Sequence, residues 1–274
     1  MKIHNENLNL EQIAESGQCF RMNKTTQGSY TLVALGKYLE LRQEEKNSIW
    51  LSCSEEEFDL LWRDYFDLDY DYGRIVKVLT TGNDPFLREA AAYGYGIRIL
   101  KQDFFEMLIS YIISQNKNIP AIKSCIEGLC SRYGSPIREE GTGRILAHTF
   151  PEPKALANAD KEELRSLKVG YRDEYILRAS QAVALEEIDS KAIRGYSYEE
   201  AHKLLKGIHG IGDKVANCIC LYGLHHIEVF PVDVWIKRVL EEIYQGEFRQ
   251  EQYEGYLGIV QQYMFYYMRH RVLE

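Results

Sequence analysis

The hydrophobic pattern of the chain changes its period near residue 85. Before that point, short apolar runs alternate with polar residues and turn residues. Residues 29–41 are expected to form two strands around Gly36, and 48–53 another strand. The stretch 55–65 is amphipathic with a helical period. This half is therefore expected to be a small antiparallel sheet with attached helices.

Beyond residue 85 the apolar side chains recur at steps of three and four, which is the period of an amphipathic helix. Two such series are Phe104, Met107, Leu108, Tyr111 and Ile112, and then Ile119, Ile122, Ile126 and Leu129. Further helices are expected over 155–167, 175–185, 197–205 and 253–271. The pattern predicts an α+β fold in which a helical part follows the sheet.

Composition narrows the class of protein. The chain has 274 residues, 45% of them hydrophobic, which is enough for a substantial core. A net charge of -8 argues against a non-specific nucleic-acid coat protein, but a local basic groove remains compatible with it. We see no signal peptide after Met1 and no uninterrupted apolar run of membrane-spanning length. We therefore expect a cytoplasmic protein without membrane contact.

The six cysteines predict neither a disulfide framework nor a metal site. In a cytoplasmic chain they are expected to be free thiols. Cys218 and Cys220 lack the spacing of a zinc knuckle, and no cysteine follows them to complete an iron–sulfur site. We therefore expect no cofactor and no required metal.

A glycine-rich turn over 207–212 stands between two predicted helices. Gly207, Gly210 and Gly212 allow positive φ and the close approach of another chain. Asp213 then begins a helix, where free backbone N–H groups suit an anion such as phosphate. A tight turn between helices uses glycine for packing as well, so the turn alone leaves DNA binding and a purely structural role equally open.

Lys214 and Asp233 are the candidate catalytic residues. Lys214 is nearly the only long charged side chain on an otherwise apolar helix. An amine in an apolar cleft is poorly solvated in its charged form, and a neutral amine is the nucleophile that a covalent step at a sugar carbon needs. Asp233 is a favoured helix N-cap. A capping carboxylate beside a reacting sugar also stabilises positive charge as a glycosidic bond breaks.

Spacing suggests a pocket for a flat ring. Cys218 lies four residues after Lys214, and Phe265 lies four residues after Gln261, so each pair shares a helix face. If the two faces oppose each other, a ring fits between the sulfur and the phenyl group. From the sequence alone, Phe265 is more often a core residue than a pocket residue.

Four separated motifs carry a resemblance to a known family. The family's general motifs are Leu205–Ala216 and Pro231–Val234. The motifs of the 8-oxoguanine subfamily are Lys214–Leu221, Ser16–Arg21, Ser114–Ile119 and Gly170–Arg172. Together they resemble the helix-hairpin-helix DNA glycosylases, and within them the bacterial-type 8-oxoguanine DNA glycosylases with abasic-site lyase activity. The resemblance spans nearly the whole chain. It implies a TATA-binding-protein-like sheet domain over 1–85, with the C-terminal helix packing back near it, and a helical domain over 86–274 that holds the helix-hairpin-helix at about 198–223.

The resemblance also implies the reaction. The enzyme would extrude and excise 8-oxoguanine from double-stranded DNA and cleave the abasic site by β-elimination. Lys214 would attack C1′ and form an imine, and Asp233 would be the catalytic carboxylate. The Gly17 carbonyl would accept the hydrogen on N7 that 8-oxoguanine has and guanine lacks.

The same resemblance assigns the remaining contacts. Cys218 and Phe265 would enclose the base, Gln261 would bind its Watson–Crick edge, and Pro231 would line the pocket. For the DNA, Asn116 and Tyr171 would fill the gap in the base stack, Arg172 would read the unpaired cytosine, and the carbonyls of the 207–212 hairpin would hold a monovalent cation. A monomer acting on the bacterial nucleoid is expected.

Two positions depart from the family pattern. Ala121 stands where many relatives carry a second cytosine-reading arginine, so we expect weaker selectivity for the opposite base. Trp235 stands where eukaryotic relatives carry a phosphate-binding histidine. Two alternatives stay open: a monofunctional alkylpurine glycosylase on the same fold, and a non-catalytic helix-hairpin-helix DNA-binding module.

Overall fold

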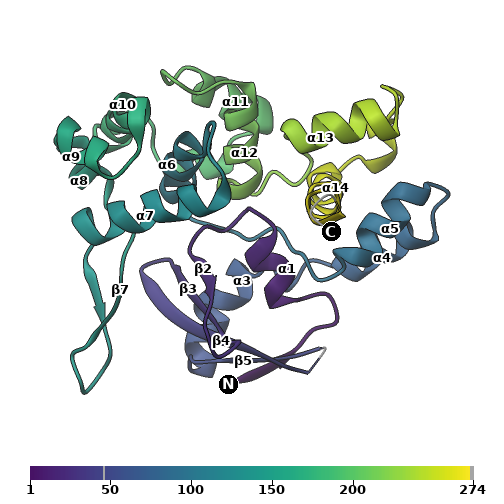
Figure 1. Ribbon diagram of the computed structural model, residues 1–274, viewed down its shortest axis with the longest axis horizontal. Coiled ribbons are helices and arrows are strands. Elements are labelled where there is room, and N and C mark those ends of the chain that lie inside the picture. The colour runs from purple at the N-terminus through teal and green to yellow at the C-terminus, as the bar shows by residue number, and fades with distance from the viewer. Residues whose placement is uncertain (46, 272–274) are drawn as a thin grey trace.

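A five-stranded antiparallel sheet forms the N-terminal part of the chain. The computed structural model describes residues 1–45 and 47–271. The strands are β1 (Lys2–His4), β2 (Met22–Lys24), β3 (Tyr30–Ala34), β4 (Lys37–Glu45) and β5 (Ser48–Leu51), in the order β1-β5-β4-β3-β2. Figure 1 shows this sheet as a separate layer beneath the helices.

The turn between β3 and β4 confirms the two strands predicted around Gly36. Leu35 and Gly36 both have positive φ, 52° and 74°, which matches the twist of a two-residue hairpin. The pairing Ala34 with Lys37 and Leu32 with Leu39 puts alternate residues on the buried face. Strands β1 and β2 were not predicted. Each has only three residues, too few to show an alternating pattern.

The amphipathic stretch over 55–65 is helical, as predicted, but it is not a uniform α-helix. It consists of α2 (Glu55–Glu57), a wider π-helical turn η1 (Phe58–Trp62) and α3 (Arg63–Tyr65). Phe58, Trp62 and Tyr65 are buried beneath the sheet with its other apolar residues. The side chain of Ser54 caps the segment by accepting from the Glu57 N–H.

The remainder of the chain is mainly helical, so the fold class is α+β as predicted. The main helices are α4 (Tyr72–Thr81), α5 (Pro85–Tyr93), α6 (Phe104–Ser114), α7 (Ile119–Tyr133), α10 (Asp173–Ala184), α11 (Tyr198–Lys206), α12 (Asp213–Gly223), α13 (Val234–Arg238) and α14 (Leu257–Arg271). Helix α14 is buried on nearly all sides, and Figure 1 shows it end-on between α13, α1 (Leu10–Glu15) and α4.

Two local features differ from the sequence prediction. The single helix expected over 155–167 is divided into α8 (Pro153–Ala157) and α9 (Lys161–Ser166), because Asp160 caps the second helix. A two-stranded ribbon, β6 (Pro136–Arg138) and β7 (Ile145–His148), interrupts the helical part. In Figure 1 the ribbon projects away from the helices. It is largely exposed and therefore lacks the apolar alternation by which a strand is recognised.

The loop between α1 and β2 is held from both sides. Gln18, which is fully buried, donates to the Arg98 carbonyl at 2.8 Å and accepts from the Leu100 N–H at 2.9 Å. From α14, Gln262 Nε2 donates to the Ser16 carbonyl at 2.7 Å. The backbone at Gly17 is thereby restrained between the segment at residues 98–100 and the C-terminal helix. No helix in the described ranges 1–45 and 47–271 has the length and apolar character to cross a membrane.

Candidate active site

A cavity of about 890 Å³ lies where five segments of the chain meet. Its walls come from the α1–β2 loop, the end of α6 with the start of α7, helix α12, residues 231–237, and helix α14. Pockets for small molecules typically measure roughly 300–1,000 Å³, so this one has room for a purine. The predicted residues that line it are Gly17, Asn116, Gly212, Lys214, Cys218, Pro231, Asp233, Gln261 and Phe265.

Helix α12 presents Lys214 and Cys218 to the cavity, as their four-residue spacing predicted. The Lys214 amine lies 5.6 Å from the centre of the Tyr111 ring, so the aromatic face contacts the cation. Burial raises the pKa of the Cys218 thiol, although the nearby Lys214 charge opposes that shift. Cys218 therefore stays a neutral thiol and forms an apolar wall.

Asp233 caps helix α13, which confirms the predicted N-cap. Its Oδ1 accepts from the N–H groups of Trp235 at 3.0 Å and Ile236 at 2.9 Å. Burial raises the pKa of Asp233, while the Ile236 N–H and the positive charge of Lys214 act in the opposite direction. The carboxylate is thus fixed in position by the backbone and lies within electrostatic reach of the Lys214 amine.

Gly17 and Phe265 lie beside each other in the wall of the cavity. Gly17 has φ of 76°, and a Cβ built on it would lie 3.1 Å from Phe265 Cε1. Phe265 is half-buried, whereas its neighbours Met264 and Tyr266 are buried in the core. The structure therefore places Phe265 at the pocket rather than in the core.

Asn116 and Tyr171 meet at the edge of the cavity. Asn116 Nδ2 donates to the Tyr171 hydroxyl at 3.1 Å, and the Tyr171 side chain is 53% exposed. Arg172 is placed differently from an exposed base reader. It is buried, stacks on the Tyr171 ring at 4.4 Å and donates to the carbonyls of Val169 and Gln115. Contact with an unpaired cytosine would require Arg172 to leave these carbonyls.

The glycine hairpin between α11 and α12 takes a left-handed conformation at one of its three glycines. Only Gly210 has positive φ, at 91°, whereas Gly207 and Gly212 have φ of -69° and -94°. The close approach at Gly210 is made by the Tyr175 ring, 2.4 Å from where a Cβ would stand. Of the three glycines that allow positive φ, Gly210 alone uses this freedom, and the close approach of another chain occurs at the same residue.

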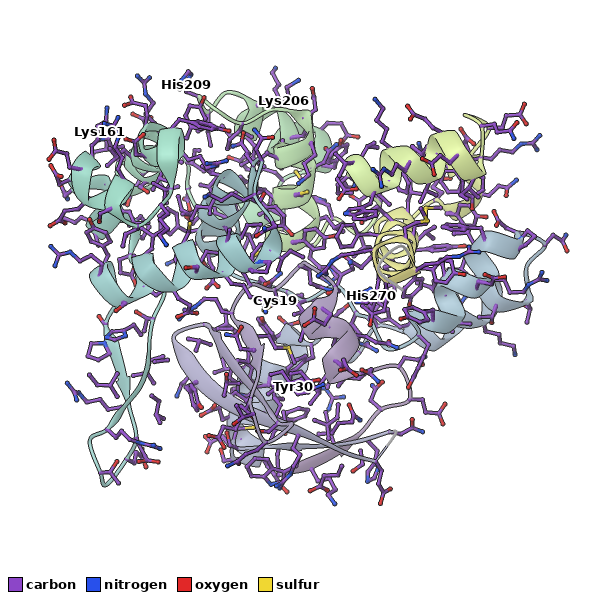
Figure 2. The ribbon with its side chains drawn as sticks, viewed as in Figure 1. Cys19, Tyr30, Lys161, Lys206, His209 and His270 are labelled. Carbon is purple, nitrogen blue, oxygen red and sulfur yellow. The ribbon has the colours of Figure 1, made fainter. Side chains whose placement is uncertain are left out.

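The hairpin nevertheless offers free donors. Among the described residues, no backbone carbonyl accepts from the N–H groups of His209, Gly210 or Gly212. The Gly210 carbonyl accepts from Gln115 Nε2 at 3.1 Å, so this oxygen is already engaged. Figure 2 shows Lys206 and His209 at the outer edge of this hairpin. Such a set of outward N–H groups is suited to a phosphate.

The charge around the cavity differs from that of the whole chain. Four cations and two carboxylates line it, namely Lys117, Lys214, Lys237 and Arg269 with Asp213 and Asp233. The local excess of positive charge suits a polyanion despite the net charge of -8. Within the described part of the chain, no cluster of three or more histidine, cysteine or acidic side chains is arranged to hold a metal.

Four residues around the cavity were missed by sequence reasoning. Tyr111 and Tyr222 stack with ring centres 5.4 Å apart, and Gln115 and Gln262 bond to backbone carbonyls near the site. Tyr222 had a usable signal, because it continues the four-residue spacing of Lys214 and Cys218. The glutamine contacts join distant segments and have no local signal.

The fold and the cavity together define a helix-hairpin-helix DNA glycosylase. Residues 1–108 match the model of the 8-oxoguanine DNA glycosylase N-terminal domain. Residues 109–256, more than half of the chain, match the HhH-GPD superfamily base excision DNA repair protein model. The chain belongs to the HhH-GPD superfamily of base excision DNA repair proteins, and to its 8-oxoguanine DNA glycosylase branch.

Individual relatives agree with this family. A probable N-glycosylase/DNA lyase of Methanothermobacter thermautotrophicus is 33% identical over 74% of this chain and 72% of its own length. The N-glycosylase/DNA lyase of Saccharomyces cerevisiae is 28% identical over 89% of this chain and 70% of its own. The 8-oxoguanine glycosylase/lyase of Clostridium acetobutylicum, solved with double-stranded DNA containing cytosine opposite 8-oxoguanine, is similar with a TM-score of 0.90. It is 32% identical, covering 99% of this chain and 98% of that chain.

Replacing Gly17 with alanine should slow excision of 8-oxoguanine at least tenfold. A left-handed non-glycine residue costs about 1–2 kcal/mol, and the new methyl group would press on the Phe265 ring. The measurement is the single-turnover rate of base release from duplexes that carry 8-oxoguanine or guanine. Gly36→Ala is the matched control, since Gly36 has φ of 74° with no atom near its Cβ position. Equal rates in the two variants would refute the placement of Gly17 at the base.

The pH dependence of base release should show the raised pKa of Asp233. If Asp233 is the catalytic carboxylate, the rate is full above its pKa in the folded protein and falls as the pH drops through that pKa. Because burial raises that pKa, the midpoint should lie above 3.8, the ordinary value. Single-turnover rates of base release across acid and neutral pH measure this midpoint. Circular dichroism at each pH shows whether the enzyme is still folded. The residual rate of Asp233→Asn should lack this limb, and a midpoint at or below 3.8 would contradict the dominance of burial.

Proposed function

We propose that this chain is a bifunctional DNA repair enzyme that excises 8-oxoguanine from double-stranded DNA and cleaves the resulting abasic site. One observation carries the proposal: Lys214 and Asp233 line one purine-sized cavity, close enough for the lysine charge to act on the carboxylate. An amine and a carboxylate side by side in such a cavity suit covalent chemistry at a sugar carbon.

The chemistry proceeds in two stages. Lys214 attacks in its neutral form: Nζ bonds to C1′ as the bond from C1′ to the base breaks. The base leaves with the electron pair and takes up the proton that the newly bonded amine releases. Asp233 stabilises the positive charge that develops on the sugar. Opening of the sugar ring then gives an imine between Lys214 and C1′. Loss of a C2′ proton breaks the bond from C3′ to oxygen and releases the 3′ phosphate.

Recognition of the base rests on the walls of the cavity. The Gly17 carbonyl accepts the N7 hydrogen of 8-oxoguanine, which guanine lacks, and guanine would instead present a lone pair there. Cys218 and Phe265 enclose the ring, with Pro231 beside them, and Gln261 bonds to the Watson–Crick edge. The fixed backbone at Gly17 and its contact with the Phe265 ring support this arrangement.

Extrusion of the nucleotide uses the edge of the cavity. Tyr171 wedges into the base stack and Asn116 fills the gap, supported by their hydrogen bond and by the exposure of Tyr171. Arg172 releases the carbonyls of Val169 and Gln115 and then donates hydrogen bonds to the unpaired base. Phosphate binds at the hairpin N–H groups of Gly210 and Gly212, and Gly207 ends the preceding helix.

Selectivity for the opposite base is expected to be weak. Ala121 lies in the first turn of α7 and offers no side-chain donor. Trp235 lines the cavity, where its indole ring contacts the guanidinium of Arg238 at 5.3 Å. Three further parts of the proposal rest on the resemblance. The protein is a monomer that acts on the nucleoid in the bacterial cytoplasm, its chain divides into two domains near residue 85, and the hairpin binds a monovalent cation.

A monofunctional alkylpurine glycosylase remains the nearest rival. Such an enzyme activates water with its carboxylate and has no need of an amine at position 214. A non-catalytic helix-hairpin-helix module would need neither Lys214 nor Asp233. The position of Lys214 inside the cavity, rather than on the hairpin surface, favours the lyase over both.

Replacing Lys214 with glutamine provides the decisive test. Binding of a duplex with 8-oxoguanine should persist, because the pocket walls remain. Base release and strand cleavage should fall at least about 1,000-fold, because the nucleophile is gone. The measurements are equilibrium binding and single-turnover cleavage on the same duplex.

Lys237→Gln is the matched control for charge. Lys237 also lines the cavity but is exposed, with 68% of its side chain accessible. This variant should weaken DNA binding and keep cleavage of the bound duplex. Strand cleavage that persists in Lys214→Gln would reject the lyase, and lesion DNA left intact by the unaltered enzyme would favour the non-catalytic module.

A further inference from the structure

A chain of buried polar side chains leads from the α1–β2 loop to Gln261. Gln262 is fully buried, and its Nε2 donates to the Ser16 carbonyl at 2.7 Å. Its Oε1 contacts the Tyr222 hydroxyl, and the same hydroxyl lies 3.4 Å from Gln261 Oε1. Two amide oxygens thus approach one phenol oxygen, on side chains that are almost entirely buried behind the cavity wall.

The orientation of Gln262 is determined by the backbone. A carbonyl oxygen can only accept, so the Gln262 amide must turn its nitrogen toward Ser16. Its oxygen then faces Tyr222 and accepts the one hydrogen bond that the Tyr222 hydroxyl can donate. Burial raises the pKa of Tyr222 well above its ordinary value, so the hydroxyl keeps that proton. Stacking on Tyr111, with ring planes 12° apart, holds the phenol ring in place.

The hydroxyl of Tyr222 has no second proton to give to Gln261. Its oxygen can still accept a hydrogen bond, and amide oxygen and nitrogen are distinguished only by such partners. Among the described residues, Tyr222 is the one hydrogen-bond partner of the Gln261 side chain. We propose that Gln262 and Tyr222 are positioning residues that turn the Gln261 amide, so that its nitrogen donates to Tyr222 and its oxygen faces the cavity.

This orientation sets which base edge the cavity accepts. The inference rests on the proposed function, in which Gln261 meets the Watson–Crick edge of an oxidised purine. An oxygen at that position accepts from the N1–H and the exocyclic amine of 8-oxoguanine. It repels the unprotonated N1 of 8-oxoadenine. The two bases share the N7 hydrogen, so contact with the Gly17 carbonyl is the same for both.

The test compares excision of 8-oxoguanine and 8-oxoadenine by Tyr222→Phe and Gln262→Leu. Tyr222→Phe frees the Gln261 amide to rotate, and the ratio of the two single-turnover rates should fall about tenfold. Gln262→Leu removes the acceptor from Tyr222, whose proton then turns to Gln261 Oε1 and sends the Gln261 nitrogen into the cavity. The ratio should therefore fall at least as far, whereas loss of the bond from Gln262 to Ser16 slows release of both bases alike.

Tyr263→Phe is the matched control. Tyr263 follows Gln262 on α14, is fully buried and has a hydroxyl without a hydrogen-bond partner in the described chain, and it does not line the cavity. Its removal should leave the ratio unchanged. Cleavage of a preformed abasic site, which needs Lys214 but no base, should proceed normally in every variant and reports correct folding.

The outcomes separate the inference from the proposed function. An unaltered enzyme that fails to release 8-oxoguanine would reject the proposed function. A second outcome is that the unaltered enzyme excises 8-oxoguanine normally. If Tyr222→Phe or Gln262→Leu then cleaves abasic DNA normally and keeps the ratio of 8-oxoguanine to 8-oxoadenine excision unchanged, the role of Tyr222 and Gln262 is overturned. An equal loss of ratio in Tyr263→Phe would also overturn it, since general disturbance of α14 would then explain the effect.

Discussion

The site depends on keeping one buried carboxylate charged. Withdrawal of Asp233 from water disfavours its ionised form, and the structure opposes this with two backbone N–H groups and the neighbouring Lys214 charge. The same two N–H bonds begin helix α13 at Val234. The proposed chemistry and the fold are thus linked at one side chain, because the group that we propose to stabilise a developing sugar cation also caps helix α13.

The proposed recognition of the base depends on a second constraint, the immobility of the loop between α1 and β2. Gln18 binds this loop to the backbone of residues 98–100, and Gln262 binds it to α14, more than 240 residues away in sequence. Arg269 adds a further bond from α14 to the Glu15 carbonyl at 2.6 Å. The carbonyl of Gly17, which we propose to distinguish a hydrogen from a lone pair on N7, needs a fixed position, and these bonds restrain the loop that carries it.

Much of this arrangement could be predicted from the sequence. The strands around Gly36, the cap at Asp233 and the shared face of Lys214 and Cys218 follow from local spacing, and local spacing is what a sequence displays directly. The pairing of the Gly17 loop with Phe265 could not be derived from spacing and came from resemblance to a family. A hydrogen bond such as Gln262 to Ser16 leaves no local pattern, because its partners meet only after folding.

The differences have similar causes. Helices α8 and α9 are separate because a cap at Asp160 competes with the apolar period. The projecting β6–β7 ribbon has no buried face to impose an alternating pattern. At the hairpin, packing of Gly210 on the Tyr175 ring determines which glycine takes positive φ, and that ring comes from another helix. Arg172 is buried because the carbonyls of Val169 and Gln115 outcompete solvent for its guanidinium.

The proposed mechanism requires that the Lys214 amine bonds to the sugar of an extruded nucleotide. Reduction of the reaction mixture with borohydride traps such a bond, and proteolysis with mass mapping then identifies the peptide that carries DNA. One covalent adduct is expected, at Lys214, formed with DNA that contains 8-oxoguanine. An adduct at another lysine, or efficient base release without any adduct, would contradict it.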